Sequence, residues 1–139
     1  MMKRYDGKCG CGTVRVVLSL PAAIETYAPR ACDCNFCQSR NGIYVSDPAG
    51  ALKIITGGHL TETKQGDEIA IMLHCSKCND LISAAYKLNG ELRGNVCAPL
   101  LGEANKFQPA VPISPQTLPP AEKIARWSEL WMPITIEQV

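Results

Sequence analysis

The sequence has few aromatic residues, almost no net charge and no long hydrophobic run. Aromatic residues make up 6% of its 139 positions, so a core must be built mainly from aliphatic side chains. The 14 Lys and Arg residues against 13 Asp and Glu give a formal net charge of +1, which supplies no broad cationic surface for nucleic acid. The early apolar stretch at 14–20 is interrupted by Arg15 and Ser19 and is far shorter than the ~20 residues that span a bilayer. We therefore expect neither nucleic acid nor a membrane as a partner.

The length and composition predict one folded domain over residues 1–139. The chain has 139 residues, of which 46% are hydrophobic, enough for a core of ordinary size. Residues 1–9 carry charges and a glycine where a secretory signal would have its apolar stretch. We therefore expect a cytoplasmic protein whose cysteines stay reduced. Dense thiols in a reducing compartment indicate metal or redox chemistry.

Short alternating segments predict a mainly β protein. In residues 13–20, Val14, Val16, Leu18 and Leu20 alternate with residues that are mostly polar, the period-2 pattern of a half-buried strand. Shorter runs of the same kind lie at 24–28, 43–45, 52–56, 69–73 and 81–86, separated by turn-prone Asn, Gly, Asp and Pro residues. Short strands without long helical periods favour small antiparallel sheets over a doubly wound α/β sheet.

The segment after residue 99 has a different composition. Seven of the ten prolines lie between Pro99 and Pro133, and proline removes backbone donors. We expect residues 99–139 to form a Pro-rich tail laid across the surface. Within it, the spacing of apolar residues predicts one helix over Ala121–Trp131, with Trp127 and Trp131 holding the tail to the body.

The strongest signal is the spacing of the cysteines. Seven of the eight fall into three clusters, which are Cys9 with Cys11, Cys32 with Cys34 and Cys37, and Cys75 with Cys78. A Cys-x-x-Cys turn directs two thiolates at one tetrahedral Zn²⁺. The first pair precedes a predicted strand and the last pair follows one, so antiparallel pairing can join them in a closed four-cysteine zinc site. The alternative is a set of buried thiols or disulfides.

The middle cluster offers three cysteines and no fourth ligand of its own. Zinc on Cys32, Cys34 and Cys37 keeps an open position for water or an incoming thiol, as catalytic zinc does. The alternative is a second structural zinc completed by Cys97 or a histidine. Cys97 itself has apolar neighbours and is interpreted as a small buried hydrophobic residue, with fourth ligand or resolving thiol as the alternatives.

Other polar residues near the clusters receive weaker assignments. His74 directly precedes Cys75 and either packs within its strand or binds the metal or a zinc-bound sulfur. His59 lies in a predicted loop and is assigned no role. Arg30, Arg40 and Lys53 lie near the middle cluster in sequence and either bind a ligand carboxylate or lie on a solvated surface.

The cysteine pattern resembles a known family. Gly7-x-Cys9-x-Cys11-Gly12-x-Val14, followed by the triple at 32–37 and the pair at 75–78, is similar to the glutathione-dependent formaldehyde-activating enzyme family, which also contains centromere protein V. The resemblance covers roughly residues 5–115, the expected core. It implies a β-tent fold of small antiparallel sheets, a structural zinc on the first and last pairs, and a second, labile zinc on the middle three cysteines. It also implies carbon–sulfur lyase activity, which joins formaldehyde to glutathione as S-(hydroxymethyl)glutathione.

Three positions depart from the pattern of that family. Asp33 stands where the family often has His, Gln38 where it has a basic residue, and Asn79 where it has Gly. Asn tolerates the left-handed backbone that such a turn requires. Asp33 and Gln38 make the middle cluster less favourable for an anionic thiol.

These observations leave three hypotheses. The first is a zinc enzyme that uses Cys32, Cys34 and Cys37 to activate a small thiol, such as glutathione, for addition to a small carbonyl. The second is a non-catalytic zinc-binding module. The third is a redox sensor whose middle cysteines release zinc and form a disulfide on oxidation.

Overall fold

Strands dominate the computed structural model, which describes residues 2–33, 37, 42–64, 69–114 and 118–139. The strands are β1 (Lys3–Lys8), β2 (Arg15–Leu20), β3 (Arg30–Cys32), β4 (Ile43–Val45), β5 (Ala51–Thr56), β6 (Leu60–Lys64), β7 (Ile71–Cys75), β8 (Leu81–Leu88), β9 (Glu91–Gly94), β10 (Val96–Cys97), β11 (Val111–Ile113) and β12 (Met132–Gln138). The helices are α2 (Pro120–Leu130) and the 3₁₀ turns η1 (Ile24–Thr26), η2 (Ala98–Leu100) and η3 (Ala104–Lys106). The predicted mainly β protein with a short C-terminal helix is confirmed.

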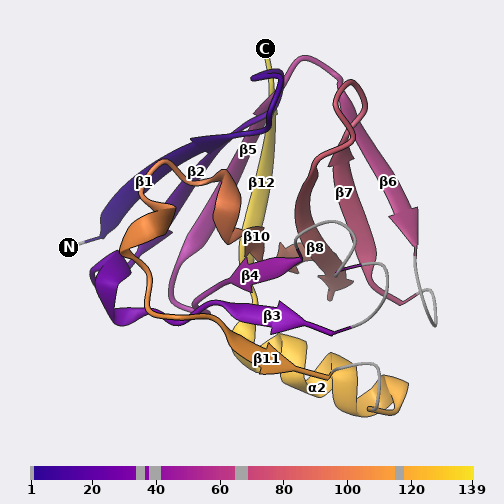
Figure 1. Ribbon diagram of the computed structural model, residues 1–139. Helices are drawn as coiled ribbons and strands as arrows, with labels where there is room; N and C mark the ends of the chain where they lie inside the picture. Colours follow the sequence, from indigo (N-terminus) through magenta and orange to yellow (C-terminus); the bar gives the residue numbers. More distant parts are fainter. Residues whose placement is uncertain (1, 34–36, 38–41, 65–68, 115–117) are drawn as a thin grey trace.

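The larger sheet consists of two antiparallel groups that one strand joins. Its order is β1-β2-β5-β12-β9-β8-β7-β6. β12 runs parallel to β5 from Ile134 to Gln138 and pairs antiparallel with β9 only at Met132 and Pro133. Figure 1 shows the two groups splayed apart, with β1, β2 and β5 on one side and β6, β7 and β8 on the other. They enclose a wedge that the core fills.

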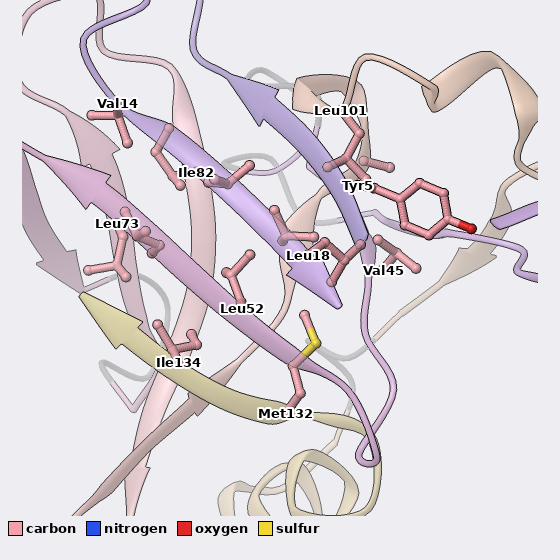
Figure 2. Close-up of a cluster of buried hydrophobic side chains, with 14 of the residues drawn as sticks. Tyr5, Val14, Leu18, Val45, Leu52, Leu73, Ile82, Leu101, Met132 and Ile134 are labelled. Carbon is pink, nitrogen blue, oxygen red and sulfur yellow. The ribbon is translucent and has the colours of Figure 1, made fainter. Parts of the chain in front are cut away.

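The core follows directly from the alternation in the sequence. Val14, Leu18 and Leu20 are each 0% exposed, as the period-2 pattern at 13–20 predicts. In Figure 2, Leu18, Leu52 and Ile134 project from three neighbouring strands into the same cluster, and Leu73 and Ile82 belong to that cluster from the other group of strands. Aliphatic side chains therefore supply most of the contact between the two groups.

The C-terminal segment differs from the predicted surface tail. Met132 is 0% exposed and Ile134 is 8% exposed, and β12 lies between β5 and β9 in the larger sheet. The expected core boundary near residue 115 is therefore too early. Residues 132–136 do alternate between apolar and other residues, and Pro133 fits because it lies at the short junction with β9, beyond the β5 ladder.

A second sheet crosses the lower part of the molecule in Figure 1, in the order β10-β4-β3-β11. β11 is an edge strand that contains Pro112 and pairs parallel with β3, a position where a missing backbone donor is tolerated. α2 matches the predicted helix to within one residue at each end and has proline in its first turn. Trp127 and Trp131 stack with ring centroids 4.5 Å apart and both are buried, as expected for residues that hold the helix to the body.

Among the described residues, no helix combines the length and apolar character needed to cross a membrane.

Candidate metal centre

Two turns from the two groups of strands bring four cysteines together. Cys9 and Cys11 follow β1, while Cys75 ends β7 and Cys78 lies in the turn before β8. In Figure 1 these turns lie at the top of the molecule, at the opposite end from α2. The N–H of Gly12 donates to the Cys9 carbonyl at 3.0 Å, and the N–H of Asn79 donates to the Cys75 carbonyl at 2.9 Å. Each pair is thus held in a tight turn.

Each of the two cysteine turns contains one residue with a positive φ angle. Gly12 has φ of 76° and Asn79 has φ of 63°, the left-handed region that favours Gly and, among other residues, Asn. The sequence expectation that Asn79 adopts this conformation is confirmed. Asn79 therefore adopts the left-handed backbone conformation for which a glycine was expected at this position.

The sulfur atoms have the spacing of a tetrahedral metal site. The four Sγ atoms of Cys9, Cys11, Cys75 and Cys78 all lie within 4.8 Å of one another. Cys11 Sγ is 3.6 Å from Cys9 Sγ and 3.7 Å from Cys75 Sγ. Sulfurs bound at about 2.3 Å to tetrahedral Zn²⁺ lie about 3.8 Å from one another, whereas a disulfide joins its sulfurs at about 2.05 Å. The four cysteines can therefore hold one zinc ion, and the disulfide alternative does not fit these distances.

Backbone donors and one carboxylate surround this group. The N–H groups of Val14 and Lys77 donate to the sulfurs of Cys9 and Cys75, each at 3.4 Å, as second-sphere donors do in thiolate metal sites. The N–H of Gly10 donates to Asp80 Oδ2 at 2.7 Å, which links the first turn to the second. These contacts orient the ligands and join the two groups of strands at this end.

The protonation of two of these thiols differs. Hydrogen bonding with the side chain and backbone of Thr13 lowers the pKa of Cys11 to about 6, and Cys11 Sγ lies 3.1 Å from Thr13 Oγ1. Burial raises the pKa of Cys78 to about 12, so this thiol is protonated at neutral pH without a cation. A bound divalent cation deprotonates such a ligand outright, which couples metal binding here to proton release.

The structure describes two members of the middle cluster, Cys32 and Cys37, while Cys34 lies outside the described residues. Cys32 is half-buried at the end of β3 and Cys37 is 1% exposed. Both are held by Gly42, whose carbonyl accepts from the N–H of Cys32 at 3.1 Å and whose N–H donates to the Cys37 carbonyl at 2.7 Å. A Cβ at Gly42 would lie 2.5 Å from Cys37 Cβ, so only glycine permits this approach.

Cys97 is buried beside this cluster, as the sequence predicts. It is 2% exposed and pairs across strands with Tyr44. Burial raises the pKa of its thiol strongly. Cys97 also lines a pocket of about 230 Å³ together with Lys8, Gly10 and Asp80, on the side toward the four-cysteine group. Within the described ranges, that group is the one set of three or more ligand residues close enough to share an ion, so Cys97 completes no such set there.

The remaining candidates have other positions. His74 is a buried strand residue whose Nε2 lies 2.7 Å from Thr63 Oγ1, in keeping with the packed alternative. His59 is half-buried in the loop between β5 and β6. Lys53 lies on β5 of the larger sheet, and its Nζ is 3.6 Å from a carboxylate oxygen of Glu137. This ion pair does not support a role for Lys53 in binding a ligand carboxylate. Arg40 lies outside the described residues, and Arg30 is on β3.

Two residues that the sequence did not single out take part in the sites. Asp80 is the carboxylate that accepts from Gly10, and the Tyr44 hydroxyl lies 3.0 Å from Cys37 Sγ. The sequence offered one indication for each residue, which is its position close to a cysteine cluster. Asp80 directly follows the turn of Cys75 and Cys78, and Tyr44 is two residues after Gly42.

Comparison with known proteins supports the fold. No protein-family model matches the chain, and no curated protein matches it either. A crystal structure of a Rhodobacter sphaeroides protein from a structural genomics programme is similar, with a TM-score of 0.55 and 26% sequence identity over 70% of this chain and 87% of that chain. A solved structure thus shares the fold over 70% of this chain.

Proposed function

We propose that this protein is a zinc-dependent carbon–sulfur lyase of the S-(hydroxymethyl)glutathione synthase type. It activates a small thiol, glutathione or a similar compound, for addition to formaldehyde or another small carbonyl. It works in the cytoplasm, where such thiols stay reduced. The cysteine pattern shared with the glutathione-dependent formaldehyde-activating family supports membership of that family.

The observation that carries the proposal is the separation of two cysteine sets with different properties. The set of Cys9, Cys11, Cys75 and Cys78 has four ligands at tetrahedral spacing, which is typical of a closed structural site. Cys32 ends β3 of the smaller sheet, Cys37 precedes β4 in the chain, and both are held by Gly42. Together with Cys34 they offer three thiols, which is typical of a site that keeps a position for substrate.

The middle set fits zinc by the chemistry of its donors. Thiolates suit Zn²⁺, and zinc held by these three residues supplies a Lewis acid that lowers the pKa of a thiol brought to it. The residues of this chain hold and orient the cluster. The Tyr44 hydroxyl and Cys37 sulfur share a hydrogen bond, which fixes one ligand, and Gly42 sets the spacing of the two described cysteines.

The reaction balances without an oxidant or reductant. The substrate sulfur attacks the carbonyl carbon and forms the carbon–sulfur bond. The π electrons of the carbonyl move to its oxygen, which takes the proton released by the thiol. The lyase direction reverses each of these steps.

The proposal is tested by measuring the number of zinc ions bound per protein together with the rate of the proposed thiol addition reaction. Protein purified without added metal is assayed for zinc, before and after excess glutathione, in the wild type, in Cys34→Ser and in Cys97→Ala. We expect two zinc ions in the wild type, of which one is labile to glutathione, and one in Cys34→Ser with turnover lost and the fold kept. Cys97→Ala is the control for loss of a buried thiol and should keep both ions. Unchanged turnover in Cys34→Ser would remove the enzyme proposal and leave a zinc-binding module.

A further inference from the structure

The pocket of about 230 Å³ beside the four-cysteine group lies where three parts of the chain meet. Of the residues that line it, Lys8 ends β1, Asp80 directly precedes β8, and Cys97 ends β10 just before η2. Leu101, which follows η2, forms an isolated bridge with Gly7, so η2 is held against β1. The volume corresponds to about eight water molecules at liquid density, which is enough for a small metabolite.

Two residues of opposite charge line this pocket. The ion pairs among the described residues involve neither Lys8 nor Asp80. Asp80 is half-buried, and its Oδ2 accepts from the N–H of Gly10, another lining residue, at 2.7 Å. This bond fixes the carboxylate in the wall, and a carboxylate with one such bond can accept several more. Lys8 is exposed, and its flexible side chain carries three donors. The pocket therefore has a fixed anion and an adaptable cation.

Uncharged residues supply much of the remaining wall. Leu81 and Cys97 are buried, at 4% and 2% exposure, and Leu100 of η2 is half-buried. Burial and the nearby charge of Asp80 both raise the pKa of the Cys97 thiol. This thiol is therefore neutral at ordinary pH and behaves as a small apolar group rather than as a nucleophile. A concave site with an apolar wall and a few polar groups is the usual form of a small-molecule site.

We propose that this pocket binds the zwitterion of a small α-amino acid with an apolar side chain. An anion alone would also meet the charge of Asp80, and a cation alone would also meet that of Lys8. A zwitterion instead places an opposite charge beside each of them, and its side chain contacts the apolar wall. The site contains none of the three cysteines of the middle cluster, so it stands independently of the thiol addition proposed above.

The experiment titrates the full chain, as purified, with L-leucine and two analogues in a calorimeter. The first analogue, 4-methylpentanoate, lacks the ammonium group of leucine, and the second, 3-methylbutylamine, lacks its carboxylate. We expect leucine to bind with a dissociation constant below about 1 mM and each analogue to bind at least about tenfold more weakly. Absence of leucine binding, or equal binding of leucine and either analogue, would overturn the proposal.

Variants assign each charge of leucine to its partner. Lys8→Gln should remove the preference for leucine over 3-methylbutylamine, and Asp80→Asn should remove the preference over 4-methylpentanoate. Asn keeps a side-chain oxygen that accepts from the N–H of Gly10, so the turn should be retained. Lys3→Gln and Asp6→Asn change exposed residues of β1 away from the pocket and should leave both preferences intact. Preferences that survive both pocket variants would place leucine elsewhere and overturn the site. If a variant does not fold, the comparison of analogues on the wild type still decides.

Discussion

The hydroxyl of Tyr44 lies 3.0 Å from the sulfur of Cys37, and both groups are buried, at 5% and 1% exposure. Burial strongly raises the pKa of the Tyr44 hydroxyl, and the neighbouring thiols of Cys97 and Cys37 raise it further. The phenol therefore stays protonated at any ordinary pH and can donate to a sulfur that carries charge. A donor of this kind stabilises a thiolate ligand and fixes its direction.

Replacing Tyr44 by Phe should weaken metal binding at the middle cluster. Loss of an outer hydrogen bond to a ligand typically reduces metal affinity about 10–100-fold. Competition with a chelator measures the effect on the second zinc ion proposed for this cluster, while an ion at the four-cysteine site should be unaffected. Tyr86→Phe is the matched control, because Tyr86 contacts Trp127 through its ring, with centroids 5.7 Å apart. Equal zinc affinity in Tyr44→Phe and Tyr86→Phe would show that the bond to Cys37 has no such role.

Removing one ligand of the four-cysteine site should unfold the protein. Cys75→Ser leaves three thiols, and a closed zinc site contributes its binding free energy directly to folding. We expect loss of one zinc and of the cooperative thermal transition, measured by metal analysis and circular dichroism. Cys97→Ala removes a cysteine that is also buried but stands outside the group, so it should lose no zinc. A folded Cys75→Ser protein with full zinc content would contradict the assignment.

Replacing Trp127 by Ala should release α2 from the smaller sheet. Trp127 stacks on Trp131 at an interplanar angle of 5° and packs in the buried cluster with Tyr44 and Cys97. Truncation of a buried Trp costs about 3–5 kcal/mol of the free energy of unfolding, which urea denaturation measures. Ser128→Ala changes an exposed residue of the same helix and should stay within about 0.5 kcal/mol of the wild type. A similar small effect in Trp127→Ala would mean that α2 is not held by this contact.

The turn after Cys78 should accept Gly but not Val. Asn79 has φ of 63°, and a β-branched residue is strained in this region by about 1–2 kcal/mol. Asn79→Val should lower the free energy of unfolding by about that amount and weaken zinc binding at the four-cysteine site. Asn79→Gly should keep both properties near those of the wild type. Thermal melts with and without chelator compare the two variants, and equal behaviour would indicate that the turn adapts its backbone.

The features predicted well from the sequence are those with a strong local pattern. Alternation at 13–20 specifies β2, and apolar spacing with a proline at the start specifies α2. The convergence of two cysteine pairs was also predictable, because antiparallel pairing and metal-ligand spacing agree there. Cys34 cannot be compared, since it lies outside the described residues.

The features that were missed depend on contacts distant in sequence. β1 and β6 are edge strands of the larger sheet with mostly exposed residues, so their sequences lack a clear apolar alternation. Residues 24–28 were predicted as a strand, but residues 24–26 form the 3₁₀ turn η1. In this turn only Ile24 is buried, and it packs in the core. The position of β12 depends on pairing with β5, about eighty residues earlier in the chain, which no local pattern reports.

The pairing of β12 also has a consequence for the order of folding. β12 is the strand that connects β5 to β9 in the larger sheet, so before Met132–Gln138 has been synthesised the two groups of strands have no shared ladder. A nascent chain on the ribosome therefore exposes the unpaired edge of β5, and contacts of such long sequence separation form slowly. Early zinc capture by the cysteines at 9–11 and 75–78, which precede β12 by more than fifty residues, can hold the two groups together until the joining strand emerges.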